Sequence, residues 1–166
     1  MTAKQILLDQ LAACRDKSDW FVSAAAALKG LTASQAARRD DTDEHSVWQI
    51  VNHILFWNQR FLDRFQGRPV AKLEDVELAF EGERTSGSEA QWQTVVANLD
   101  GVMAGWIEAV RGSDEARLES RLKPDDPGTW YGVLTHMTIH TAHHLGQIVT
   151  LRKSHGAWDA AKGWSA

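Results

Sequence analysis

Four of the seven histidines of this chain lie within nine positions, in the segment HMTIHTAHHLGQ at residues 136–147. On a helix, residues four apart share one face about 6 Å from each other, so two imidazoles at that spacing can bind one metal ion. His136, His140 and His144 follow this spacing. The outer two would lie about 12 Å apart along the axis, too far for one ion with metal–nitrogen bonds of about 2.1 Å. The helix therefore offers one pair, either His136 with His140 or His140 with His144.

A third ligand has to come from another segment, and His53 is the candidate. It lies in VNHILF, three residues after Ile50, and is predicted to face inward with the apolar residues of its helix. A single inward-facing histidine is typical of a hydrogen-bonded core residue, but opposite a histidine pair a metal ligand is the better interpretation. Three imidazoles would leave the fourth tetrahedral position open for water or substrate. Such a site suits Zn, Ni, Cu, Co or Fe(II), and the sequence does not choose among them.

Four long amphipathic segments are predicted to position these histidines. Their apolar residues recur at helical spacing, and three segments begin with Ser or Thr followed three residues later by Gln, the capping-box pattern. Residues 31–45 and the charged segment after residue 111 are predicted to be loops, and a short helical piece is predicted near 73–80. The predicted helices span residues 2–29, 46–66, 88–111 and 129–154.

These helices predict one all-α domain over residues 1–166, a four-helix bundle with a tail at 156–166. The connection of about 21 residues between the second and third helices is longer than antiparallel neighbours need, which indicates a crossover. The fourth helix would then run antiparallel to the second. His53 would lie about 18 Å from the end of its helix, and His140 and His144 about 16 and 22 Å from the start of theirs. The crossover therefore favours His53, His140 and His144, whereas an up-down-up-down order would favour His136 and His140.

The composition is that of an ordinary globular protein, with 43% hydrophobic and 24% charged residues. The net charge of −4 comes from interspersed acidic and basic residues, so a nucleic-acid partner is not expected. No apolar run is long enough for a signal peptide or a membrane span, and a cytoplasmic location is expected. The single cysteine, Cys14, excludes an internal disulfide and a cysteine-rich metal site. The eight tryptophans are spread along the chain and are interpreted as packing residues.

The segments SVWQIVNHILFW and HMTIHTAHHLGQIVTLRK resemble the DinB/YfiT-like superfamily of four-helix-bundle metalloenzymes, which is unrelated to the DNA polymerase of the same name. The family pattern is a histidine in the second helix and His-x-x-x-His-x-Gly-Gln in the fourth, often followed by an arginine. The resemblance extends to helix order and linker lengths over essentially the whole chain. The residues that match the pattern are His53, His140, His144, Gly146, Gln147 and Arg152.

The resemblance implies a metal-binding triad of His53, His140 and His144, often with Zn or Ni, in a fold whose members are frequently dimers. Better-understood relatives are thiol-dependent S-transferases and a thiol-dependent isomerase. We therefore expect a metal-dependent transferase that activates a low-molecular-weight thiol towards an electrophilic small molecule. A metal-dependent hydrolase is the nearest alternative. The others are a non-enzymatic metal-binding or stress-response module and a helical scaffold whose histidines only pack.

Other polar residues near these motifs have simpler interpretations. His136 is interpreted as a core residue or a support for a ligand, and His143 as a surface or cleft-rim residue. Gln147 is expected to hydrogen-bond either a ligand imidazole or a neighbouring helix. His45 would line a cleft or be solvated, and His155 would lie near a helix C-terminus, which favours a protonated imidazole.

Overall fold

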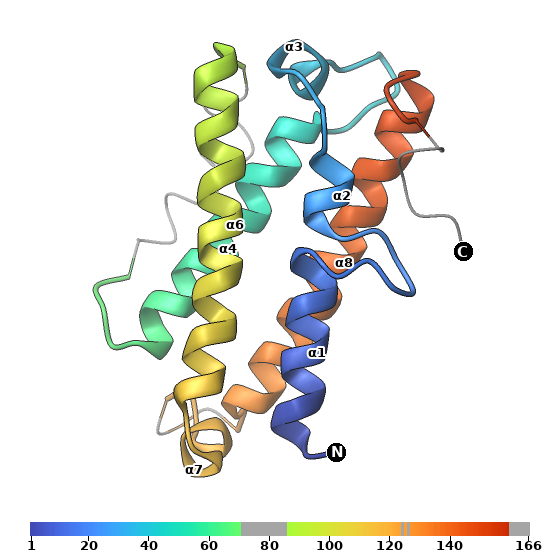
Figure 1. The fold of residues 1–166 in the computed structure, drawn as a ribbon. Coiled ribbons are helices and arrows are strands. Elements are labelled where there is room, and N and C mark those ends of the chain that lie inside the picture. Colours follow the sequence, from blue (N-terminus) through green and yellow to red (C-terminus); the bar gives the residue numbers. More distant parts are fainter. Residues whose placement is uncertain (71–85, 124, 126, 160–166) are drawn as a thin grey trace.

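The structure, a computed structural model, describes residues 1–70, 86–123, 125 and 127–159. Within these residues the chain is helical, as the sequence predicted, and the only extended pairing is an isolated bridge between Arg121 and Thr129 (Figure 1). None of the described helices combines the length and the apolar content that crossing a membrane would require. The helices are α1 (Ala3–Arg15), α2 (Ala24–Leu28), α3 (Ala33–Ala37), α4 (Val47–Phe65), α6 (Glu89–Gly112), α7 (Glu115–Glu119) and α8 (Trp130–Ser154).

Side-chain caps define where the long helices begin. At the start of α4, the Ser46 hydroxyl accepts a hydrogen bond from the Gln49 backbone N–H, and the Gln49 side chain accepts one from the Ser46 N–H. The same capping box starts α1 and α6, and Thr129 caps α8. Each N-cap typically contributes about 1 kcal/mol to stability. With these caps, α4, α6 and α8 occupy the ranges predicted for the second, third and fourth helices to within one residue.

The predicted continuous helix over residues 2–29 is wrong. Helix α1 ends at Arg15, and α2 begins only at Ala24. Between them the Ser18 hydroxyl accepts a hydrogen bond from the Ser23 N–H, and the Ser23 hydroxyl accepts one from the Ala26 N–H. Short polar side chains that bond to nearby backbone compete with helical hydrogen bonds, and here they end one helix and start another.

Two short helices also correct the predicted loops. Helix α3 lies within residues 31–45 and α7 within the charged segment after residue 111, each with its own N-cap, Thr32 and Asp114. Both helices are only one turn long, so they lack the periodicity from which a helix is recognised in a sequence. The helical piece predicted near 73–80 lies outside the described residues.

Helices α4 and α6 run in the same direction, and α8 runs antiparallel to α4 (Figure 1). Near the starts of α4 and α6, Trp48 packs against Trp92 with ring centroids 5.0 Å apart. At the end of α4, Phe65 packs against Trp130, the first residue of α8, with centroids 4.9 Å apart. Most of the connection from α4 to α6 lies outside the described residues, so the crossover itself stays a prediction.

Two apolar clusters fill the space between the long helices. One contains Trp48 and Trp92 together with residues of α2 and α3, and the other contains Trp106 and Trp130 near α7. These four tryptophans are fully buried, as expected of packing residues. Trp57 and Trp158 are half-buried, whereas Trp20, between α1 and α2, has 88% of its surface exposed and does not fit that interpretation.

Arg152 holds α2 against α8. Its guanidinium is buried and donates hydrogen bonds to the backbone oxygens of Ala27 and Lys29 at the end of α2. It also donates to the oxygen of Ala157, which follows α8. The last carbonyls of a helix have no partner within the helix, so this arginine satisfies groups that would otherwise be buried without a donor.

We predict that Arg152→Met lowers the free energy of unfolding by about 2–4 kcal/mol, because it leaves the buried carbonyl of Ala27 and the partly buried carbonyls of Lys29 and Ala157 without this donor. Urea denaturation followed by circular dichroism measures this loss. The control is Lys153→Met, which changes an exposed neighbour and is expected to shift stability by less than about 0.5 kcal/mol. Similar losses in the two variants would show that the carbonyls of α2 do not depend on Arg152.

Candidate metal centre

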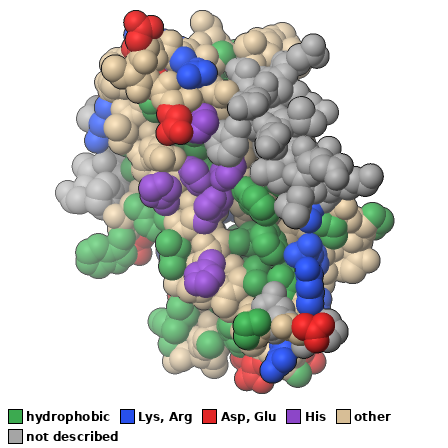
Figure 2. Space-filling model, turned by 180° about the vertical axis from the view of Figure 1, so that it is seen from behind, with side chains coloured by type: hydrophobic (Ala, Val, Ile, Leu, Met, Phe, Trp, Pro, Cys, Tyr) green, Lys and Arg blue, Asp and Glu red, His purple; other side chains and the backbone are tan. Residues whose placement is uncertain are grey.

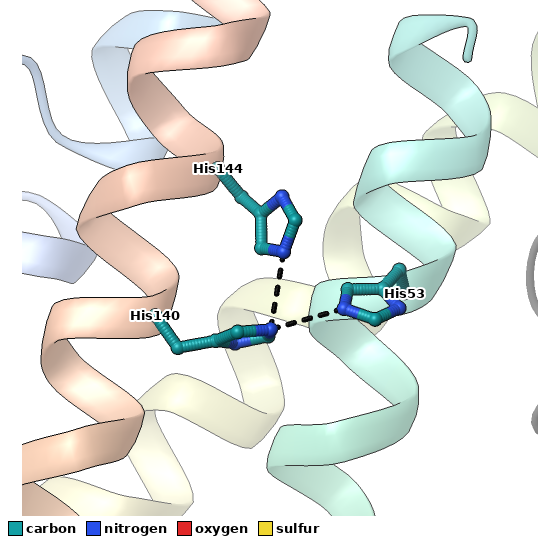
Figure 3. Close-up of side chains that lie close together, drawn as sticks. All are labelled: His53, His140 and His144. Carbon is teal, nitrogen blue, oxygen red and sulfur yellow. Dashed lines mark hydrogen bonds between the residues drawn. The ribbon is translucent and has the colours of Figure 1, made fainter. Parts of the chain in front are cut away.

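Three imidazoles meet between α4 and α8 (Figure 3). His53 Nε2 lies 3.0 Å from His140 Nε2, and His140 Nε2 lies 3.1 Å from His144 Nε2. His53 projects from α4, whereas His140 and His144 project from successive turns of α8. Of the two pairs that the spacing allowed, the structure therefore brings His140 and His144, and not His136, together with His53.

A buried polar contact one turn away holds the two helices at this level. Asn58 of α4 donates a hydrogen bond to Thr141 Oγ1 of α8 at 3.4 Å and another to its own helix at Ile54 O. Asn58 and Thr141 are both buried, so losing Asn58 would remove this hydrogen bond from the Thr141 hydroxyl in an apolar environment. Sequence analysis did not single out this pair, although an amide on the apolar face of α4 was a visible signal.

The three imidazoles are neutral at neutral pH. Burial lowers the pKa of His53 to about 3 and that of His140 to about 4, and repulsion from the neighbouring imidazoles adds to both shifts. Burial also lowers the pKa of His144, although the hydrogen bond to Gln147 opposes that shift. A neutral imidazole carries the lone pair that a metal requires, so the triad does not have to lose protons before it binds an ion.

Gln147 selects the tautomer of His144. Its Oε1 lies 2.6 Å from His144 Nδ1, and an amide oxygen can only accept, so Nδ1 carries the proton. The unprotonated Nε2 of His144 then faces the other two rings. An outer partner of this kind is typical of histidine ligands, because it fixes the ring and makes the facing nitrogen more basic.

The spacing of the Nε2 atoms suits a metal ion. The His140 nitrogen faces two others, and one proton on it cannot make a linear hydrogen bond to both, whereas a cation between the rings attracts all three lone pairs. Tetrahedral coordination with bonds of about 2.1 Å places ligand nitrogens about 3.4 Å apart, a few tenths more than the observed 3.0 and 3.1 Å. Small ring rotations cover that difference.

The triad leaves one tetrahedral position for an external ligand. No other His, Cys, Asp or Glu in the described parts of the chain brings a ligand atom within reach of the group formed by His53, His140 and His144. A site closed by four protein ligands is typical of structural zinc, whereas three ligands are typical of catalytic zinc. The arrangement can therefore bind an ion and still admit a small molecule.

The remaining histidines near the site lie outside the triad. His136 is exposed, so its interpretation as a core residue is wrong. His143 is also exposed, with its ring 5.3 Å from that of His144, which agrees with the predicted position at the rim. His45 is half-buried, and its positive form contributes to the lowered pKa of His53 and His144.

A second group of possible ligands, Asp40, Asp43 and His155, has its own partners. Arg38 donates to both carboxylate oxygens of Asp40, at 3.0 and 2.9 Å. Asp43 Oδ2 accepts hydrogen bonds from the Asp40 N–H and lies 2.7 Å from His155 Nε2. With an arginine already bound, this group is a polar network that ties the segment before α4 to the end of α8.

Comparison with known proteins agrees with this geometry. A family model described as the DinB superfamily matches residues 22–148, a range that contains α4, α6 and the three facing histidines. No curated protein matches the chain, and no solved structure matches it either.

We predict that replacing His53, His140 or His144 with Ala weakens Zn or Ni binding by more than about 100-fold, since even losing an outer partner of a ligand typically costs 10- to 100-fold. Elemental analysis of untagged protein and chelator competition measure the effect. His136→Ala is the matched control, because this histidine lies on α8 but outside the triad, and it should retain wild-type affinity. Unchanged metal content in His53→Ala would remove α4 from the site.

We also predict that the metal-free protein loses stability as the pH falls from 7 to 5. The unfolded chain binds protons near the ordinary imidazole pKa of 6.5, whereas His53 and His140 in the folded chain do so only near about 3 and 4. Unfolding therefore takes up protons below pH 6.5, and acid favours the unfolded state.

Urea titrations at several pH values measure this slope, which should be shallower for His53→Gln than for the wild type. Equal slopes in His53→Gln and wild type would show that the imidazole of His53 titrates alike in the folded and unfolded chains.

Proposed function

The chain belongs to the DinB superfamily, and from this membership and the three converging imidazoles we propose that it is a metal-dependent enzyme that transfers a low-molecular-weight thiol to an electrophilic small molecule. His53, His140 and His144 would hold the ion, with Zn or Ni as the proposed metals. The observation that supports this proposal most is the convergence of three neutral Nε2 atoms with no fourth protein ligand among the described residues.

An ion bound by three imidazoles lowers the pKa of a thiol or water at its open position, which supplies a nucleophile at neutral pH. The residues of the chain prepare this position in two ways. Gln147 keeps the proton of His144 on the outer nitrogen. The three rings are only half-buried, so a small molecule can reach them from solvent.

Aromatic side chains beside the triad suit an apolar substrate body. Trp57 follows His53 by one turn of α4, and its ring lies edge-on to the imidazole with centroids 6.3 Å apart. Phe61, one turn further, stacks on Trp57 with centroids 6.0 Å apart. Both rings are half-buried, so Trp57 offers apolar surface beside the triad and Phe61 continues it further along α4.

We predict that Zn- or Ni-loaded protein conjugates a thiol to monochlorobimane faster than metal-free protein does. The assay uses glutathione, cysteine, coenzyme A, bacillithiol and mycothiol in turn and follows bimane fluorescence. His140→Ala should lower the rate at least about 100-fold, because it removes the ligand between the other two. His136→Ala should leave the rate unchanged.

The alternatives give different results in the same preparations. Ester hydrolysis that needs the metal but no thiol would replace the transferase with a hydrolase. Stoichiometric metal binding without turnover of any thiol or ester would replace it with a non-enzymatic metal-binding module. If His136→Ala lowered the rate as much as His140→Ala does, the activity would not depend specifically on the triad.

A further inference from the structure

Arg60 is a buried arginine on the same side of α4 as His53. Seven residues are almost two helical turns, so the two residues point within about 20° of each other and lie about 10 Å apart along the axis. Trp57 lies between them on this side of the helix. Seen from the face opposite to that in Figure 1, hydrophobic side chains lie directly beside the histidine cluster and basic side chains lie beyond them (Figure 2).

The guanidinium of Arg60 has an unsatisfied donor. The residue is only 8% exposed, and its Nη1 is buried with no hydrogen-bond partner among the described residues. Arg152 is equally buried, at 7% exposed, but donates to three backbone oxygens. The two arginines therefore differ in their partners and not in their burial.

The acidic residue nearest to Arg60 along α4 is already occupied. The Asp63 carboxylate forms an ion pair with Arg68 at 2.7 Å and accepts a hydrogen bond from the Gln59 side chain at 2.8 Å. The adjacent cation, Arg64, lies over the ring of Phe61, with its guanidinium carbon 5.6 Å from the centroid. Arg60 differs from Arg64 because its Nη1 is buried without a hydrogen-bond partner among the described residues, whereas Arg64 is only half-buried and can be hydrated.

A buried charge without a counter-charge is costly, and proteins keep such groups paired or use them to bind. A guanidinium presents a planar fork of N–H donors that matches the two oxygens of a carboxylate. The side chain between this fork and the triad on the same side of α4 is Trp57, which is half-buried. The arrangement suits a molecule that is reactive at one end, apolar in the middle and anionic at the other end.

We propose that Arg60 binds the carboxylate of a substrate whose reactive end lies at the histidine triad and whose body lies on Trp57. This inference rests on the proposed function, because it names the chemical class of one of the two substrates of that site. The carboxylate belongs either to the thiol or to its electrophilic partner. Arg60 is a binding residue in this scheme, and it sets which thiol or which acceptor is used.

The test compares acids with matched alcohols by isothermal titration calorimetry. In the first arm, Zn-loaded protein is titrated with 6-mercaptohexanoate and 6-mercaptohexan-1-ol, whose chain lengths suit the distance from His53 to Arg60. In the second arm, metal-free protein is titrated with 6-phenylhexanoate and 6-phenylhexan-1-ol. Preference for the acid in the first arm alone assigns the carboxylate to the thiol, and preference in the second arm assigns it to the acceptor.

We predict that the wild type binds the acid at least about 10-fold more tightly than the alcohol in one of the arms, as a charge-assisted bidentate contact warrants. Arg60→Met should abolish this preference. Arg64→Met is the matched control, an arginine one turn further along α4, and should retain it. The absence of a preference in both arms, or its persistence in Arg60→Met, would overturn the proposal.

Melting temperatures separate binding from a structural role. Arg60→Met should melt at or above the wild-type temperature, because it replaces an unpaired buried charge with an apolar chain of similar length. A fall of several degrees would show that Arg60 forms an ion pair within the chain, which overturns the proposal.

The outcomes also separate this inference from the function on which it rests. Thiol conjugation without any preference for acids leaves the transferase in place and removes the anion site. An Arg60-dependent preference for 6-phenylhexanoate, without conjugation of any thiol, keeps the anion site and removes the transferase.

Discussion

The candidate site depends on the antiparallel register of α4 and α8. His140 and His144 share a helix face by their spacing alone. His53 reaches them only if α4 packs on α8 in the register that places His53 at the same height as this pair. The contact between Asn58 and Thr141 sets that level from the side, and the packing of Phe65 on Trp130 sets it at the end. A shift by one turn, about 5.4 Å, would carry His53 away from the pair. The apolar core and the polar contact therefore act together to assemble the three ligands.

Bringing three imidazoles together in a half-buried space lowers their pKa values and so disfavours their protonated forms. Burial disfavours the charge of all three rings, and neighbouring imidazoles add to this effect, with His144 lowering the pKa of both His53 and His140, so the lone pairs stay free. Gln147 then determines which nitrogen of His144 is free. The same packing that stabilises the fold thus prepares neutral, correctly oriented ligands, and a bound cation would relieve the crowding of the three nitrogens.

Much of this arrangement could be predicted from the sequence, for physical reasons that also explain the failures. Long helices such as α4 and α8 carry periodic apolar residues and caps, so their ends and their inward residues could be recognised. The break between Arg15 and Ala24 could not, because it depends on local bonds of Ser18 and Ser23 in a stretch whose apolar spacing still suits a helix. His136 shows a related limit, because the spacing that it shares with His140 does not reveal which turn of α8 faces a partner.

The two buried arginines show how the fold distributes its polar groups. Arg152 satisfies carbonyls that the end of α2 leaves open, and its charge is stabilised by the structure that it completes. The buried Nη1 of Arg60 has no comparable partner among the described residues. Replacing Arg60 with an apolar residue would therefore break no described hydrogen bond of that atom. Groups that stability alone does not explain are concentrated where proteins bind ligands. Its place on α4, two turns beyond His53 and past an aromatic surface, makes the triad one end of a longer binding site.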